Sequence, residues 1–160
     1  MAQNLEDQIT LLRHEIAQYK SIIKEMSVPL IESSLNNTLL MPLSGHLFQE
    51  RITQIEAKLF NYLQEHRHVK TVIMDFTGIS HKNTIMMSTD ELSDALRNLH
   101  TTLTVVGIRV VYTGFQPEVT FNFVKSGFNE QLETYPTYRL ALEHLYKELH
   151  FFTENLKNED

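Results

Sequence analysis

Apolar residues recur at alternating intervals of four and three positions over the first 26 residues of the chain. This spacing is a heptad repeat, and isoleucine at a with leucine at d favours a parallel two-stranded coiled coil. Glu15 and Lys20 then occupy g and e positions that can pair between the two helices. A helix packed on its own domain is the alternative interpretation. The predicted dimerisation seam consists of Leu5, Ile9, Leu12, Ile16, Tyr19, Ile23 and Met26.

After Pro29, which ends this first helix, strand-like and helix-like patterns alternate along the chain. Such alternation predicts an α/β fold with a largely parallel central sheet flanked by helices. We expect a coiled-coil helix over 1–27, one α/β domain over 28–150 and a polar tail over 151–160. The predicted strands cover 28–35, 38–43, 69–74, 108–112 and 132–134, and the predicted helices cover 48–66, 88–106, 117–126 and 138–152. In the third helix of this series, Val119, Phe123 and Val124 are expected to face inward.

Composition narrows the possible partners and the compartment. The chain has 160 residues, 42% of them apolar, and a net charge of −6, so it can bury a core and is a poor match for nucleic acid. It contains no cysteine, which excludes disulfides and thiolate chemistry. The polar start and the lack of an apolar run of about 20 residues predict neither a signal peptide nor a membrane span. We therefore expect a cytoplasmic protein without a membrane partner.

Motifs that carry catalysis or bind cofactors are missing from the sequence. The eight histidines are scattered, with no HExxH arrangement, and no GxSxG, Walker or GxGxxG pattern occurs. We accordingly expect no catalytic residues, no metal site and no cofactor.

The segment 75–90 stands out because it leads from a buried strand into a helix and is rich in hydroxyl groups. Ser88 and Glu91 have the spacing of a capping box. A phosphate at a helix N-terminus is stabilised by free N–H groups and adds about two negative charges to a contact surface. Local helix capping is the alternative role for these hydroxyls. The candidate phosphoacceptors are Thr84, Thr89 and Ser88.

Three motifs in order carry a resemblance to a known family: Asp75-Phe-Thr-Gly78, Val106-Gly107-Ile, and Thr113-Gly114 followed by Pro117-Glu118. Over about 28–149 the chain resembles the STAS domain, and its RsbR type in bacterial stressosomes in particular. The resemblance implies a non-enzymatic domain with a mixed sheet, and partner switching in a sigma-factor stress pathway. It implies binding to an RsbT-like serine/threonine kinase and an RsbS-like scaffold. The implied partner-binding loop includes Asp75, Thr77, Gly78 and Asn83.

The resemblance places the acceptor ambiguously, because this loop carries extra residues. Counting forward from Asp75 gives Thr84, whereas counting back from Gly107 gives Asp90, beside Thr89. In the second alignment a carboxylate stands where phosphate would be, so Asp90 is a candidate phosphate mimic. A second acceptor position of RsbR-type proteins falls on Gln49, which cannot be phosphorylated.

Three functions follow for testing. The first is a regulatory module controlled by phosphorylation of this loop. The second is an unphosphorylatable structural subunit of a stressosome-like assembly, paired with itself through the seam. The third, a small-ligand domain for a nucleotide or lipid, has no phosphate loop in the sequence to support it.

Overall fold

The computed structural model describes residues 1–26, 28–127 and 132–157. Its strands form one sheet of five in the order β1-β2-β3-β4-β5, in which the first pair is antiparallel and the other pairs are parallel. This mixed, largely parallel sheet confirms the predicted fold class. The strands are β1 (Ile31–Glu32), β2 (Thr38–Ser44), β3 (Thr71–Gly78), β4 (Arg109–Thr113) and β5 (Glu133–Tyr135).

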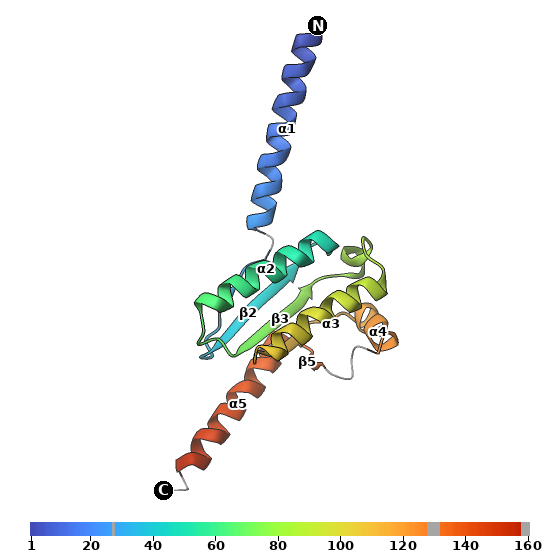
Figure 1. Cartoon of the computed structure of the whole chain (residues 1–160). Helices are drawn as coiled ribbons and strands as arrows, with labels where there is room; N and C mark the ends of the chain where they lie inside the picture. The colour runs from blue at the N-terminus through green and yellow to red at the C-terminus, as the bar shows by residue number, and fades with distance from the viewer. Residues whose placement is uncertain (27, 128–131, 158–160) are drawn as a thin grey trace.

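Helices cover both faces of the sheet (Figure 1). The larger core lies between one face and helices α2, α3 and α4, and the smaller core lies between the other face and α5. Side chains of a strand alternate between the two faces, so Met74 enters the first core and Ile73 the second. The helices are α1 (Ala2–Glu25), α2 (Gln49–Glu65), the 3₁₀ turn η1 (His81–Thr84), α3 (Thr89–Val105), α4 (Pro117–Lys125) and α5 (Tyr138–Lys157).

Helical periodicity located the buried face of α3 correctly. One side of α3 packs into the larger core, as its leucine spacing predicts. Val119 and Phe123 of α4 are buried as expected, but Val124 is 49% exposed, because it lies one residue beyond the buried face of a short helix. The buried stripe of α3 is Leu92, Leu96, Leu99 and Leu103.

Several predicted boundaries differ from the structure. The strand predicted over 28–35 is reduced to Ile31–Glu32, because the chain turns back at Asn37, whose φ is 61°. Strand β3 continues past Met74 to Gly78, so Asp75 and Thr77 lie in the strand and not in the loop after it. Helix α5 runs on to Lys157, through most of the segment predicted as a polar tail.

Helix α1 stands away from the sheet, and none of its residues is buried (Figure 1). Its end is nevertheless attached to α2. The Lys58 ammonium donates to the carbonyl oxygen of Glu25 at 3.2 Å and to that of Val28 at 2.6 Å. Val28 itself is fully buried in the larger core. The helix that carries the seam therefore leaves the domain at a fixed junction.

An ion cluster ties α5 to the sheet beside the smaller core. Arg109 on β4 donates to both carboxylate oxygens of Glu133 on β5, at 2.6 and 2.7 Å, and reaches Glu148 on α5 at 2.7 Å. Hydrogen bonds from Glu133 and then Glu148 hold the pKa of Arg109 above its ordinary value. The same contact with Arg109 lowers the pKa of Glu148. Three elements that are separate in sequence are thereby joined.

Replacing Arg109 by Met should lower the free energy of unfolding by about 1–2 kcal/mol, because two partly buried carboxylates lose their shared cation. Arg139→Met is the matched control: its ion pair with Glu143 is exposed, and we expect a change below about 0.5 kcal/mol. Because the folded pKa of Glu148 is depressed, this stabilisation exists at neutral pH and is lost as the pH falls below its ordinary value of 4.5. Urea unfolding at pH 7 and pH 3 measures both effects; an equal loss at the two pH values would contradict the ionic origin.

Candidate functional site

The segment between β3 and α3 lies at the carboxyl edge of the parallel strands, where α2, α3 and α4 all begin. Functional groups collect at this edge in open α/β sheets, because the loops there join strand ends to helix starts. Ile79 is buried and fixes the start of the segment against the larger core. The chain then forms η1 before it enters α3.

The turn η1 is held together by Asn83. The Asn83 side-chain oxygen accepts from the Ser80 N–H at 2.8 Å and from the Ser80 hydroxyl at 2.7 Å. Its backbone oxygen accepts from the N–H of Leu47, just before α2, at 2.8 Å. Asn83 was predicted to contact a partner; in the structure its side chain is half-buried and engaged inside the loop.

Helix α3 begins with the predicted capping box. The N–H of Glu91 donates to the Ser88 hydroxyl at 3.1 Å, and the Ser88 N–H donates to the Glu91 carboxylate at 2.8 Å. The hydrogen bond from the Ser88 backbone lowers the pKa of Glu91, because it favours the ionised carboxylate. Ser88 is thus occupied as the N-cap of the helix.

The three candidate acceptors differ in their surroundings. The Thr84 hydroxyl donates to the carbonyl oxygen of His81 at 2.9 Å, and the Ser88 hydroxyl serves the cap. Thr89 and Asp90 are exposed in the first turn of α3. Within the described ranges, the Thr89 hydroxyl has no hydrogen-bond partner. None of these four residues is sealed in the core, and Thr84 is the most covered, at intermediate exposure.

A small cavity of about 100 Å³ lies between this segment and α4. Its walls combine the candidate hydroxyls with apolar side chains, including Met87, Leu92 and Phe123. Beside it, Ile85 and Met86 are 69% and 62% exposed. The edge therefore presents hydroxyl groups, a carboxylate and apolar side chains together.

The Asp75 motif has a different place from the one predicted. Asp75 has the same strand parity as Ile73, so its side chain lies on the α5 face, away from η1 and α3. Its Oδ1 accepts from the Thr77 hydroxyl at 2.6 Å, the Thr77 N–H at 3.2 Å and the Thr113 hydroxyl at 3.0 Å. Asp75 and Thr77 thus form a junction between β3 and β4, on the far side of the sheet from the candidate acceptors.

Gly114 completes this junction. Its φ is +72°, and a Cβ on it would lie 2.7 Å from the Asp75 Oδ1 and from the Thr77 N–H nitrogen. Gly78 is also enclosed, since a Cβ there would lie 2.7 Å from the Leu43 carbonyl oxygen. The motifs around Asp75 and Gly114 are therefore two halves of one packing contact, which the sequence alone did not reveal.

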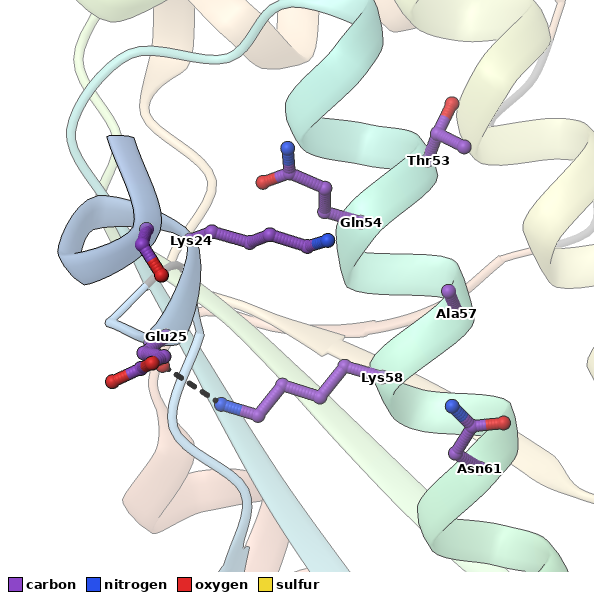
Figure 2. Close-up of a pocket in the computed structure, with 8 residues that line it drawn as sticks. Lys24, Glu25, Thr53, Gln54, Ala57, Lys58 and Asn61 are labelled. Carbon is purple, nitrogen blue, oxygen red and sulfur yellow. Dashed lines mark hydrogen bonds between the residues drawn. The ribbon is translucent and has the colours of Figure 1, made fainter. Parts of the chain in front are cut away.

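A wide hollow of about 740 Å³ separates the end of α1 from α2 (Figure 2). In Figure 2, Lys24 and Glu25 of α1 face Gln54 and Lys58 of α2 across it. The α1 residues that line this hollow, Ser21 among them, lie on the opposite side of the helix from the predicted seam. The seam is thus turned away from its own domain, and all of its residues are exposed.

Two titratable side chains, His100 and Tyr112, pair with each other. Burial lowers the pKa of His100, whose Nδ1 lies 3.2 Å from the Tyr112 hydroxyl, and burial raises the pKa of Tyr112 well above its usual range. This pair lies between α3 and β4, inside the domain. Among the residues that the structure describes, no group of three or more histidines and carboxylates could hold a metal ion. In the same part of the chain, no helix is long and apolar enough to cross a bilayer.

The architecture is an α/β domain with a mixed sheet and helices on both of its faces. One of these helices, α3, has its start exposed at the carboxyl edge of the sheet. The STAS domain family model matches residues 31–141, and the chain belongs to this family. The chain is 30% identical over 115 residues to the RsbT co-antagonist protein RsbRA of Bacillus subtilis. That match covers 71% of this chain but only 39% of RsbRA.

Solved structures agree with this fold. RsbS of Moorella thermoacetica superimposes with a TM-score of 0.61 at 14% identity, covering 77% of this chain and 97% of RsbS. The anti-sigma factor antagonist SpoIIAA in its unphosphorylated form gives a TM-score of 0.54 at 21% identity, covering 75% of this chain and 96% of SpoIIAA. The chain is thus a STAS domain related to RsbR-type proteins and sharing the fold of anti-sigma factor antagonists.

The Gly114 contact can be tested against a second glycine. Gly107 also has a positive φ, +83°, but a Cβ on it would meet no atom within 4 Å. We expect Gly107→Ala to cost about 1 kcal/mol for the backbone alone, and Gly114→Ala to cost about 3 kcal/mol or more because it also disrupts the Asp75 junction. Thermal and urea unfolding measure the difference, and equal costs would show that the close approach contributes nothing.

Proposed function

We propose that the chain is a non-enzymatic regulatory module of an RsbR-like partner-switching pathway in the bacterial stress response. The observation that supports it best is the first turn of α3, where the exposed Thr89 and Asp90 occupy the carboxyl edge of the sheet. Its proposed partners are an RsbT-like serine/threonine kinase and an RsbS-like scaffold, by relation to the RsbT co-antagonist RsbRA.

Thr89 is the acceptor that the geometry favours. Phosphorylation of Ser88 would remove a helix cap, and phosphorylation of Thr84 would break the hydrogen bond to His81. Thr89 loses no such contact. A phosphate on it would add about two negative charges beside Asp90 and Glu91, which changes the charge that a partner meets at this edge.

A second function, a structural subunit that is never phosphorylated, is favoured by one specific observation. Asp90 is exposed in the same turn of α3, so a carboxylate already occupies the surface where a phosphate would act. In that case the module keeps a constant negative charge and contributes to assembly only. Phosphate uptake at Thr89 separates the two functions.

Self-association through α1 is the third part of the proposal. The seam residues are exposed and lie on the side of α1 that faces away from the domain. A second α1 can therefore pack in parallel along the seam while the two STAS domains lie on the outside. The two copies would present their α3 starts independently.

Incubation with ATP and the kinase RsbT of Bacillus subtilis should attach one phosphate to the wild-type chain at Thr89. The phosphate should disappear in Thr89→Ala and persist in Thr84→Ala, because the Thr84 hydroxyl is held within its turn. Intact-mass measurement and peptide sequencing give the site. Wild-type chain that binds RsbT without gaining phosphate would instead support the structural subunit.

Placing a charge in the seam should abolish the dimer. Ile16→Lys is expected to convert a parallel dimer to monomer, because a lysine at an a position in a short coil leaves a buried charge. Leu11→Lys is the matched control, since Leu11 is 59% exposed, against 52% for Ile16, but lies outside the seam. Sedimentation equilibrium measures the mass, and a Leu11 variant that dissociates equally would refute the seam.

A further inference from the structure

The loop before α3 carries two large apolar side chains that the packing of the domain does not use. Ile85 and Met86 are 69% and 62% exposed, although their neighbours Ile79 and Met87 contact the larger core. They follow η1 directly and precede the N-cap of α3. We name this pair the apolar tip.

The apolar tip is held by a firm support. The Asn83 side chain closes η1 onto Ser80, and the Asn83 carbonyl oxygen accepts from Leu47 at 2.8 Å. After the tip, the N–H of Met87 donates to the Thr84 carbonyl oxygen at 3.3 Å, and Ser88 begins the capped helix. Ordered apolar side chains lose little entropy when a partner covers them, so they bind more strongly than mobile ones.

Carboxylates lie at the same edge of the sheet as the apolar tip. Helices α2, α3 and α4 start at this edge, and each has acidic residues in its first turn: Glu50, Asp90 with Glu91, and Glu118. The cations of the same edge are Lys82 on η1 and Arg51, which donates to the carbonyl oxygen of His46. Acidic groups exceed basic ones, so a complementary surface is basic around an apolar pocket.

The apolar tip lies beside the candidate phosphoacceptors, and this position indicates which partner would contact it. Ile85 lines the same cavity as Thr84, Ser88 and Thr89. A kinase whose active site reaches the Thr89 hydroxyl must therefore lie over the tip as well. We infer that Ile85 and Met86 are the specificity-determining anchor for the switch kinase, which receives them in an apolar pocket edged by lysine or arginine. This inference rests on the proposed function, because it takes the kinase as the partner.

The test compares two pairs of exposed apolar residues on the full chain. In Ile85→Ser with Met86→Ser the anchor is removed, whereas Val105→Ser with Val106→Ser alters an equally exposed pair at the far end of α3. Calorimetry with Bacillus subtilis RsbT should show about 10- to 100-fold weaker binding for the first pair and no change for the second. Phosphorylation of the tip variant should show a raised KM with kcat nearly unchanged, since the Thr89 hydroxyl is intact. Higher salt should weaken the wild-type complex.

The outcomes separate the two proposals. If the wild-type chain binds RsbT and the tip variant binds equally well, the anchor is refuted while the regulatory function stands. If the tip variant binds weakly but its melting temperature has also fallen, the single variant Met86→Gln is measured instead. Wild-type affinity in a Met86→Gln chain of wild-type stability overturns the anchor. If the wild-type chain neither binds RsbT nor accepts phosphate from it, both proposals fail together.

Discussion

The parallel pairing of β3 with β2 and β4 is the constraint on which the rest of the structure depends. Its register places Pro42, Asp75 and Thr113 side by side near the ends of their strands. Every helix that follows one of these strands then starts at the same edge. The Asp75 carboxylate reinforces the pairing at that point, because one oxygen receives hydrogen bonds from both Thr77 and Thr113. The exposed start of α3 is a consequence of this register.

This arrangement divides the residues of the sequence motifs into two sets, which lie on opposite faces of the sheet. Asp75, Thr77 and Gly114 pack against one another on the α5 face and maintain the edge. The hydroxyls and the carboxylate of the α3 start lie on the other side of β3 and meet the solvent. Adjacent residues of a strand point to opposite faces, so a motif that is continuous in sequence is divided in space. The first set therefore contributes to stability, whereas the proposed recognition role belongs to the second set.

Sequence patterns predicted the parts of the fold that local periodicity controls. The leucine stripe of α3, the Ser88–Glu91 cap and the helix at the start of the chain depend on spacing within one element, and they are found where expected. The contact between Asp75 and Gly114 joins residues 39 positions apart and leaves no periodic signal. The structural role of Asn83, which ties the loop to the start of α2, has a related cause. Its contact with Leu47 joins residues that are far apart in sequence, although its contact with Ser80 is local. The sequence could not show whether Thr84 or Thr89 is the better candidate acceptor. That choice depends on which hydroxyl already has a hydrogen-bond partner, and only the structure shows that the Thr84 hydroxyl donates to His81.

Helix α2 connects the two surfaces that the proposed function uses. In the middle of α2, Lys58 holds the chain that leaves α1, through the Glu25 and Val28 carbonyl oxygens. Just before the start of α2, the Leu47 N–H donates to the carbonyl oxygen of Asn83 in the loop that carries the apolar tip. A helix is stiff along its axis, and the buried stripe of α2 fixes it on the sheet. The exit of α1 and the loop that carries the apolar tip are therefore both attached to this one rigid element, which relates the proposed dimer seam to the proposed partner surface.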